Sequence, residues 1–330
     1  KYKIYKRAII LGYMSFISLS DAYSSMISSP EEIQSSTLGF WDIKQSTYDQ
    51  LDSTQTLTYK ILDDRSSGNI QTLETVFRQN DLYDNQVLVL TAREQTAGIG
   101  QGERVWASPR GNVYVTYTFP FPKTDALPYI KLASIIPLVA NVSVCETVEQ
   151  FGLTPEYKWI NDMLLNGKKA AGMLCKNDGE IDMYSFESKA RVRRYAIIVG
   201  IGINVNLSED EAATKYAQIK DEFKQPFGSM RIASDGKIYS VQHVLDCLTA
   251  NLCRNFMNII KGRSFDWFMP QINARLAYKG EIVAYEEEID GKKTYTNYQL
   301  VGMDARNGNA ILKSAEGQER LVNCGRIRPV

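Results

Sequence analysis

The sequence is poor in histidine and cysteine and has no excess of either charge, and each shortage excludes a class of function. The single histidine, His243, argues against histidine-rich zinc sites, Ser–His–Asp triads and Cys–His dyads, since each needs an imidazole beside its partner. The five cysteines form no C-x-x-C pair, and an odd number suits a disulfide framework poorly. The 38 basic residues balance the 38 acidic ones, so no overall field favours a nucleic-acid backbone or an anionic membrane. We therefore expect a protein with reduced thiols and neither nucleic acid nor a membrane as its partner.

The first thirty residues are unusual in composition. Lys1, Lys3, Lys6 and Arg7 precede an apolar stretch and then a Ser-rich one, an outline similar to a targeting segment. No apolar run in the chain reaches the roughly 20 residues of a membrane span. We expect residues 1–47 to be an N-terminal extension, either a targeting segment or a disordered one. The expected location is cytoplasmic, with an organelle as the alternative.

Alternating patterns predict a catalytic domain over residues 48–275. Runs rich in β-forming residues occupy 86–92, 112–119, 169–176 and 194–205, and helical spacing occupies 127–152 and 241–260. Ser53 or Thr54 can cap a further helix that ends near Arg65. Asn177-Asp178-Gly179 is expected to connect the last two strands. This alternation predicts an α+β domain in which helices flank a mixed sheet.

The pattern changes over residues 276–330, where short strands replace helices. The strand-like segments are 281–285, 294–303, 310–313 and 319–323, with Gly291, Gly308 and Gly317 at the turns between them. We expect a small β-barrel-like domain, which at this size needs docking or tight packing to be stable.

Three segments combine residues that suit an anionic ligand. In the first, Gly98, Gly100 and Gly102 permit positive φ and close approach of backbone N–H groups to a phosphate or carboxylate. Spaced glycines more often mark a mobile turn, so the flanking Gln95, an amide donor and acceptor, and Trp106, a flat face for a purine, strengthen the interpretation.

The second segment is Lys158–Asp162 with Lys168–Gly172, and the third is Gly200–Asn206. Lysines, a carboxylate and a carboxamide near strand ends could neutralise a triphosphate and hold Mg²⁺, although charged turns usually face water. Glycines inside the otherwise apolar third segment imply close approach of another group to the backbone, and packing alone would also explain them.

Together these segments resemble the biotin protein ligases, also called holocarboxylase synthetases, from about Tyr48 to the C-terminus. The resemblance implies a class II synthetase-like catalytic domain followed by a small C-terminal SH3-like barrel. Five family patterns occur in order, at Asp52–Gln55, Gln95–Pro109, Lys158–Asp162, Lys169–Gly172 and Gly200–Asn204. The chain departs from them at Gln55 (usually Asn), at Ile160 (usually Pro), and at Ile99 and Gln101, where relatives commonly carry Arg or Lys.

The resemblance implies two adjoining ligand sites. The residues that it assigns to biotin are Ser53, Thr54, Gln95, Gly98, Tyr114, Lys169, Gly172, Leu174 and Gly200. Those that it assigns to ATP are Gly100, Gln101, Arg104, Trp106, Lys158, Asn161 and Asn204. Lys169 and Asp162 are the implied catalytic pair: Lys169 contacts the biotin carboxylate and the α-phosphate, and Asp162 orients lysines or metal-bound water. The protein ligands of the metal are unknown, and Mg²⁺ is expected to bind through the ATP phosphates.

The implied activity is ATP-dependent biotinylation of a lysine in a biotin-dependent carboxylase, through biotinyl-5'-AMP. The implied partner is a biotin carboxyl carrier domain, and the enzyme is expected to be a monomer or homodimer. A lipoate or octanoate ligase or transferase of the same fold is the nearest alternative, and Gln95, Trp106-Ala107-Ser108-Pro109 and the C-terminal domain favour biotin over it. A non-catalytic biotin-binding relative is the second alternative. A repressor function is not expected, because the residues before Tyr48 lack two clear amphipathic helices.

Overall fold

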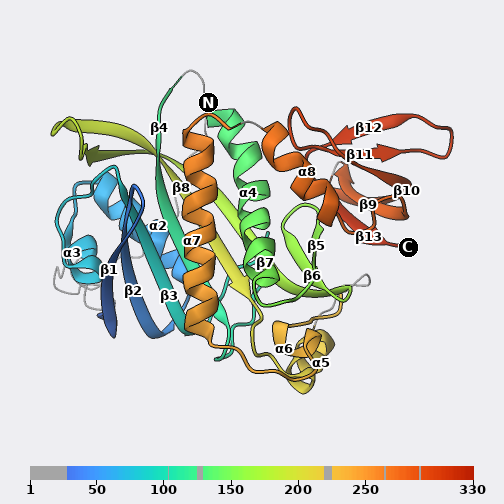
Figure 1. Cartoon of the computed structure of the whole chain (residues 1–330), viewed down its shortest axis with the longest axis horizontal. Helices are drawn as coiled ribbons and strands as arrows, with labels where there is room; N and C mark the ends of the chain where they lie inside the picture. Colours follow the sequence, from blue (N-terminus) through green and yellow to red (C-terminus); the bar gives the residue numbers. More distant parts are fainter. Residues whose placement is uncertain (1–27, 103, 125–128, 219–224, 264, 290) are drawn as a thin grey trace, which may run out of the picture.

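A computed structural model describes residues 28–102, 104–124, 129–218, 225–263, 265–289 and 291–330. Eight strands form the main sheet, in the order β1-β2-β3-β4-β8-β7-β6-β5 (Figure 1). Only β2 and β3 pair in parallel among these described strands, and the other neighbours are antiparallel. The predicted mixed sheet is therefore confirmed. Its strands are β1 (Glu32–Leu38), β2 (Trp41–Leu51), β3 (Gln86–Gln95), β4 (Val113–Pro122), β5 (Pro155–Lys158), β6 (Asp162–Leu165), β7 (Lys168–Tyr184) and β8 (Arg191–Ile203).

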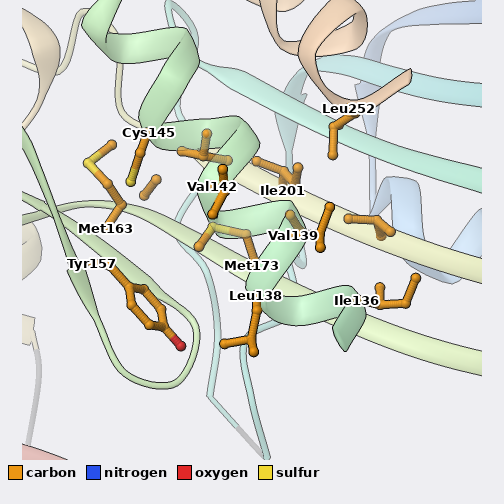
Figure 2. Packing of buried hydrophobic residues seen from close by; sticks show 14 of the residues in the cluster. Ile136, Leu138, Val139, Val142, Cys145, Tyr157, Met163, Met173, Ile201 and Leu252 are labelled. Atoms are coloured by element: carbon orange, nitrogen blue, oxygen red, sulfur yellow. The ribbon is translucent and has the colours of Figure 1, made fainter. Parts of the chain in front are cut away.

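Helices cover both faces of this sheet. On one face α4 and α7 lie side by side, and their apolar side chains meet those of β4, β7 and β8. Figure 2 shows Leu138 and Val142 of α4 packed against Met173 of β7 and Ile201 of β8. On the other face α2 and α3 cover β2 and β3 around a smaller apolar cluster. The helices are α2 (Thr54–Ser66), α3 (Gln71–Phe77), α4 (Tyr129–Glu149), α5 (Glu209–Gln218), α6 (Met230–Ala233), α7 (Val241–Ile260) and α8 (Phe265–Arg275).

One helix of the described chain, α4, is long and apolar enough to cross a membrane. This property belongs to Leu132–Glu149, of which 72% is buried inside the protein. Burial on this scale is typical of the central helix of a large core.

The structure corrects the expected domain start. Residues 32–47 were expected in an N-terminal extension, but they form β1 and most of β2 within the main sheet. Trp41 and Ile43 of β2 are buried in the main core, and β2 continues without a break into the segment before α2. In residues 32–47 the apolar positions are few and separated by polar residues, so the sequence pattern did not indicate a strand of the main sheet. The expectations for residues 1–27 lie outside the described residues.

A second correction concerns the turn between β7 and β8. Asn177-Asp178-Gly179 was expected to connect the two strands, but β7 continues to Tyr184 and the register shifts between Asn177 and Glu180. A β-bulge inserts extra residues without ending a strand, so a turn-like sequence at a bulge imitates a loop.

The C-terminal strands form a separate five-stranded antiparallel sheet in the order β12-β11-β10-β9-β13. These are β9 (Ile282–Ile289), β10 (Lys292–Met303), β11 (Ala310–Lys313), β12 (Glu319–Val322) and β13 (Arg326–Pro329), and β13 was not predicted. A small antiparallel sheet of this kind is consistent with the expected SH3-like domain. Apolar residues such as Tyr285, Leu300 and Ile327 join the main core cluster, so the sheet docks on the larger body. A sheet of this size buries too little apolar surface to be stable alone, and docking on the larger body adds to its buried surface.

Trp41→Ala tests whether β2 belongs to the structural core. Trp41 is 1% exposed, packs edge-to-face on Phe119 and donates from Nε1 to the Cys253 carbonyl at 3.1 Å. Its truncation should lower the free energy of unfolding by about 3–5 kcal/mol in denaturant titration. Phe40, its 53% exposed neighbour, is the matched control, and Phe40→Ala should cost less than about 1 kcal/mol. Equal small losses would mean that β2 is a dispensable extension.

Candidate active site

A cavity of about 1010 Å³ lies between the main sheet and the C-terminal sheet. The start of α2, the loop between β3 and β4, the β5–β6 turn, β7, β8, α5, β10 and β13 all contribute to its lining. The structure brings together every predicted site residue except Gly98. Those lining the cavity are Ser53, Thr54, Gln95, Gly100, Gln101, Arg104, Trp106, Tyr114, Lys158, Asn161, Asp162, Lys169, Gly172, Leu174, Gly200 and Asn204.

One end of the cavity is polar but uncharged. Gln95 Oε1 accepts hydrogen bonds from the backbone N–H of Thr54 at 2.9 Å and from its hydroxyl at 3.2 Å. Gln95 Nε2 donates to the Ser108 hydroxyl at 2.9 Å, and the Thr54 and Thr116 hydroxyls lie 2.9 Å apart. Because each group holds the next in a fixed orientation, this end is prepared for a ligand head with its own donors and acceptors.

The start of α2 is anchored at this end by its cap. The Ser53 hydroxyl accepts from the backbone N–H groups of Gln55 at 3.2 Å and Thr56 at 3.4 Å, as an N-cap does. Gln55, which was not assigned to the site, lines the cavity as well, and its Nε2 donates to the Leu174 carbonyl at 3.1 Å. A Cβ at Gly200 would lie 2.4 Å from Gln55 Oε1, so this glycine makes room for the longer amide.

The middle of the cavity holds a cluster of two lysines and one carboxylate. Lys169 Nζ lies 2.5 Å from Asp162 Oδ1, and Lys158 Nζ lies 3.8 Å from Asp162 Oδ2. Antiparallel pairing of β5, β6 and β7 produces this arrangement: Lys158 lies opposite Asp162, and Asp162 opposite Gly172. The adjoining Trp159–Ile160 peptide bond is cis. The sequence therefore placed all three charges correctly in one group.

Burial and mutual attraction set the pKa values in this cluster. Burial alone would raise the pKa of Asp162, but the charges of Lys169 and Lys158 outweigh it and hold the pKa below its usual range. Burial lowers the pKa of Lys158; Asp162 opposes this shift, and the positive charges of Lys169 and Arg328 add to it. Asp162 is thus an anion at neutral pH, and it keeps two ammonium groups facing the cavity.

The glycine loop folds back on itself instead of forming an open cradle. The N–H of Gly100 donates to the Arg104 carbonyl at 2.7 Å, and the N–H of Trp106 donates to the Gly98 carbonyl at 2.8 Å. Of the three loop glycines, only Gly102 has positive φ, at 68°. Gly98 serves packing within the loop, because a Cβ there would lie 2.3 Å from the Trp106 carbonyl oxygen. A glycine loop is therefore present where it was predicted, but the prediction of positive φ was wrong for Gly98 and Gly100.

Trp106 lies on a floor of two paired glycines. Gly172 of β7 and Gly202 of β8 are directly opposite each other, and a Cβ would lie 3.0 Å from the indole at Gly172 and 2.5 Å from it at Gly202. The predicted close approach to the third segment is therefore confirmed. Lys169 Nζ lies 5.2 Å from the centre of the indole ring, so the ammonium group and the ring form a cation–π interaction. Among the described residues, Trp106 Nε1 has no hydrogen-bond partner although it is buried.

The remaining predicted residues are fixed by hydrogen bonds to the backbone. Asn161 Nδ2 donates to the Met173 carbonyl at 3.0 Å, and the Tyr114 hydroxyl donates to the Pro109 carbonyl at 2.7 Å. Asn204 Nδ2 donates to the Gly228 carbonyl at 2.9 Å, while its Oδ1 is buried without a partner in the described chain. A buried carbonyl oxygen at the cavity wall is suited to a cation or a ligand N–H group.

Asn112 joins the two chain segments that border the cavity. Its Oδ1 accepts from the N–H groups of Val205 at 2.8 Å and Asn206 at 3.2 Å, just after β8. Its Nδ2 donates to the carbonyls of Pro109 at 3.1 Å and Arg110 at 3.3 Å, just after the glycine loop. One side chain therefore connects the exit of the loop with the exit of β8.

Several cavity residues were not predicted. The lining includes residues from α5 and the C-terminal sheet that match no motif, namely Lys215, Lys293, Tyr295, Arg326 and Arg328. The alternation Arg326-Ile327-Arg328 in a strand would place both arginines on one face, which is the signal that could have found them. Glu286 pairs with Arg328 and lies 3.4 Å from Lys293.

The cavity is strongly basic in a chain without net charge. Among its described lining residues, the cations are Arg104, Lys158, Lys169, Lys215, Lys293, Arg326 and Arg328, and the anion is Asp162. Such an excess raises the local concentration of anions and favours phosphate or carboxylate ligands. The arrangement can thus hold an anion in its middle and a polar, uncharged group at one end.

Comparison with known proteins gives consistent relationships. Residues 50–204 match the model of the Biotin/lipoate A/B protein ligase family. The Bifunctional ligase/repressor BirA of Bacillus spizizenii is 35% identical over 168 residues, which are 48% of this chain and 44% of that relative. The Biotin--[acetyl-CoA-carboxylase] ligase of Paracoccus denitrificans is 33% identical over 127 residues, 38% of this chain and 47% of the relative. The chain thus spans less than half the length of these curated relatives.

A solved structure shows the same fold over most of the chain. The Biotin protein ligase from Aquifex aeolicus in complex with biotin and ATP superposes with a TM-score of 0.60 and 24% identity. The match covers 87% of this chain and 99% of that chain. A mixed sheet flanked by helices is therefore common to both proteins.

Gly202→Ala tests the contact between Trp106 and the glycine floor. The added methyl would lie 2.5 Å from the indole, so we expect a loss of about 1–3 kcal/mol in the free energy of unfolding, measured in denaturant. Combining it with Trp106→Ala should remove most of this loss, because the smaller side chain leaves room for the methyl. Equal losses in both backgrounds would show that another neighbour opposes the methyl.

Proposed function

We propose that this chain, whose residues 50–204 are a domain of the Biotin/lipoate A/B protein ligase family, is an ATP-dependent biotin protein ligase. It activates biotin as biotinyl-5'-AMP and transfers the biotinyl group to a lysine of an acceptor protein. The single observation that carries the proposal is one cavity that joins an uncharged polar end to the Lys158–Asp162–Lys169 cluster.

The uncharged end favours biotin over lipoate. Besides the hydrogen bonds that they make with one another and with Ser108, the Gln95 amide has a second N–H and the Thr54 and Thr116 hydroxyls have further lone pairs that a ligand can use. The ureido group of biotin supplies two N–H donors and a carbonyl to these groups, whereas the dithiolane of lipoate supplies none. Leaving such buried groups unpaired costs about 1–3 kcal/mol each, which disfavours lipoate.

Activation forms one bond and breaks another at the α-phosphorus of ATP. An oxygen of the biotin carboxylate attacks the α-phosphorus, the bond to the bridging oxygen of the β-phosphate breaks, and pyrophosphate leaves. The ammonium groups of Lys169 and Lys158 stabilise the charge that develops on the α-phosphate, and Asp162 keeps them in place. The reaction needs no protein nucleophile, which agrees with a chain that has one histidine.

Transfer consumes the mixed anhydride. After the ammonium group of the acceptor lysine has lost a proton to solvent, its amine attacks the acyl carbon, the carbon–oxygen bond to phosphate breaks, AMP leaves, and the new amide nitrogen releases its second proton to solvent. We propose that the acceptor is a biotin carboxyl carrier domain of a carboxylase, in line with the name of the Paracoccus denitrificans relative, a biotin–[acetyl-CoA-carboxylase] ligase.

Mg²⁺ fits this site as a partner of the nucleotide phosphates. The described residues contain no group of three or more metal-binding side chains, so a cage made by the protein alone is not the arrangement. Mg²⁺ commonly binds through substrate phosphates with few protein ligands, and Asn204 Oδ1 offers one buried oxygen that has no hydrogen-bond partner among the described residues. When bound, the ion would neutralise phosphate charge during the attack.

The test is acceptor labelling by the whole chain. Purified protein is incubated with a biotin carboxyl carrier domain, Mg²⁺ and either biotin or lipoate, with and without ATP, and acceptor mass is measured. We expect a biotin adduct that requires ATP and no lipoate adduct. A lipoate adduct in the absence of a biotin adduct would favour the lipoate alternative, and biotin binding without any adduct would favour the non-catalytic one.

Lys169→Ala should lower the rate of biotin-dependent ATP–pyrophosphate exchange by about 100-fold or more, the usual effect of losing a preorganised charge donor at a developing anion. The neighbouring Lys168 is half-buried and does not line the cavity, so Lys168→Ala is the matched control and should exchange at nearly the normal rate. Near-normal exchange by Lys169→Ala would contradict the role given to this lysine.

A further inference from the structure

Lys215 brings a cation into the cavity from a part of the chain that no motif covers. It lies on α5, which follows β8, and its side chain lines the cavity. Its Nζ donates to the carbonyl of Ala107 at 2.8 Å, directly after Trp106 in the chain. The ammonium group of Lys215 thus links the helix to the glycine loop.

This ammonium group is half-buried, and among the described residues it has no counter-ion. Glu211, one turn earlier on α5, uses its carboxylate to accept from the N–H and the hydroxyl of Ser208, each at 2.8 Å. Lys215 forms no salt bridge with any carboxylate in the described part of the chain, unlike Lys158 and Lys169, which share Asp162. Burial lowers the pKa of Lys215 to about 8, and the charge of Glu211 opposes the shift. A partly desolvated cation of this kind is stabilised when an anion enters beside it.

Two lysines therefore contact the Trp106–Ala107 segment, one at the indole ring and one at the backbone. Lys169 Nζ lies 5.2 Å from the centre of the Trp106 ring, and Lys215 is bound to the next residue of the chain. Within the loop itself, Ile99 and Gln101 carry no charge, and Arg104 donates to Gln101 at 3.0 Å and 3.3 Å. A cation from α5 thus adjoins a loop that has few charges of its own.

We propose that Lys215 binds the phosphoryl group of an adenylate in the cavity and thereby holds α5 against the glycine loop. The inference rests on the proposed function and adds a ligand-binding residue to it. Both Lys169 and Lys215 line the cavity, and a phosphoryl group has several oxygens that can accept hydrogen bonds from more than one cation. The uncharged end of the cavity receives the acyl part of the adenylate. That part carries no negative charge, so it cannot pair with Lys215.

Without a ligand, the half-buried charge of Lys215 makes the stability of the protein depend on pH. In the folded chain the pKa of Lys215 is about 8, below its usual value of 10.5, so the unfolded chain binds more protons between these values. Stability should therefore rise as the pH increases from about 8 towards 10.5, and the half-buried charge of Lys215 is unfavourable below pH 8. Glu211 is the charged neighbour that acts on Lys215, whereas Lys158, Asp162 and Lys169 interact with one another and with Arg104 and Arg328.

Lys215→Met separates a ligand-binding lysine from a structural one. Affinities of the whole chain for AMP and adenosine are measured by calorimetry at pH 7, and the melting temperature is measured without ligand. We expect Lys215→Met to weaken AMP binding by about tenfold or more, to leave adenosine binding unchanged, and to raise the melting temperature. Lys215→Arg should retain the preference for AMP. Lys261→Gln removes an exposed lysine far from any motif and should behave as the wild type.

Three results would overturn the inference while leaving the proposed function intact, provided that the wild type carries out biotin-dependent ATP–pyrophosphate exchange. The first is an unchanged ratio of AMP to adenosine affinity in Lys215→Met. The second is an equal loss of both affinities together with a lower melting temperature, which would show a structural lysine. The third is a wild type that binds AMP no better than adenosine. A wild type without exchange activity and without affinity for either nucleotide would overturn the proposed function and, with it, the inference.

Discussion

The parallel alignment of β2 with β3 brings together groups that lie far apart in the sequence. In this pairing Leu51 is opposite Gln95, so the two strands end at the same edge of the sheet. The chain leaves β2 directly into the cap of α2 and leaves β3 directly into the glycine loop. Ligands of open α/β sheets are commonly bound at the carboxyl ends of such strands, where helix starts and loops converge. The bond between Thr54 and Gln95, 41 residues apart, follows from this alignment.

The antiparallel half of the sheet supplies what the parallel pair lacks, which is charge. Lys158, Asp162 and Lys169 come from three consecutive strands, β5, β6 and the start of β7, whose register places them on one patch. Glycines in the longer strands β7 and β8 lower the surface between this patch and the uncharged end, and Trp106 lies in the depression. The division of the site into an uncharged and a charged region thus follows the division of the sheet into its two pairing modes.

Much of this arrangement could be predicted from the sequence, because its parts carry local signals. The cap at Ser53, the apolar periodicity of α4 and α7, and the glycines of β8 each state a physical requirement within a few residues. What could not be predicted depends on contacts between distant segments. The polar β1 gains its place only by pairing with β2, and the lysine of α5 enters the site only because the chain after β8 returns to the glycine loop. The bulge at Asn177 was mistaken for a turn because the two share the same residue types.

Asn112 gives the cavity border a mechanical property. Its one carboxamide holds the segment after the glycine loop and the segment after β8, so the two cannot move independently without breaking hydrogen bonds. A ligand that immobilises either segment immobilises both. The conformational entropy of ordering this border is then lost in a single event, and the second contact that a ligand makes there forms against an already rigid surface.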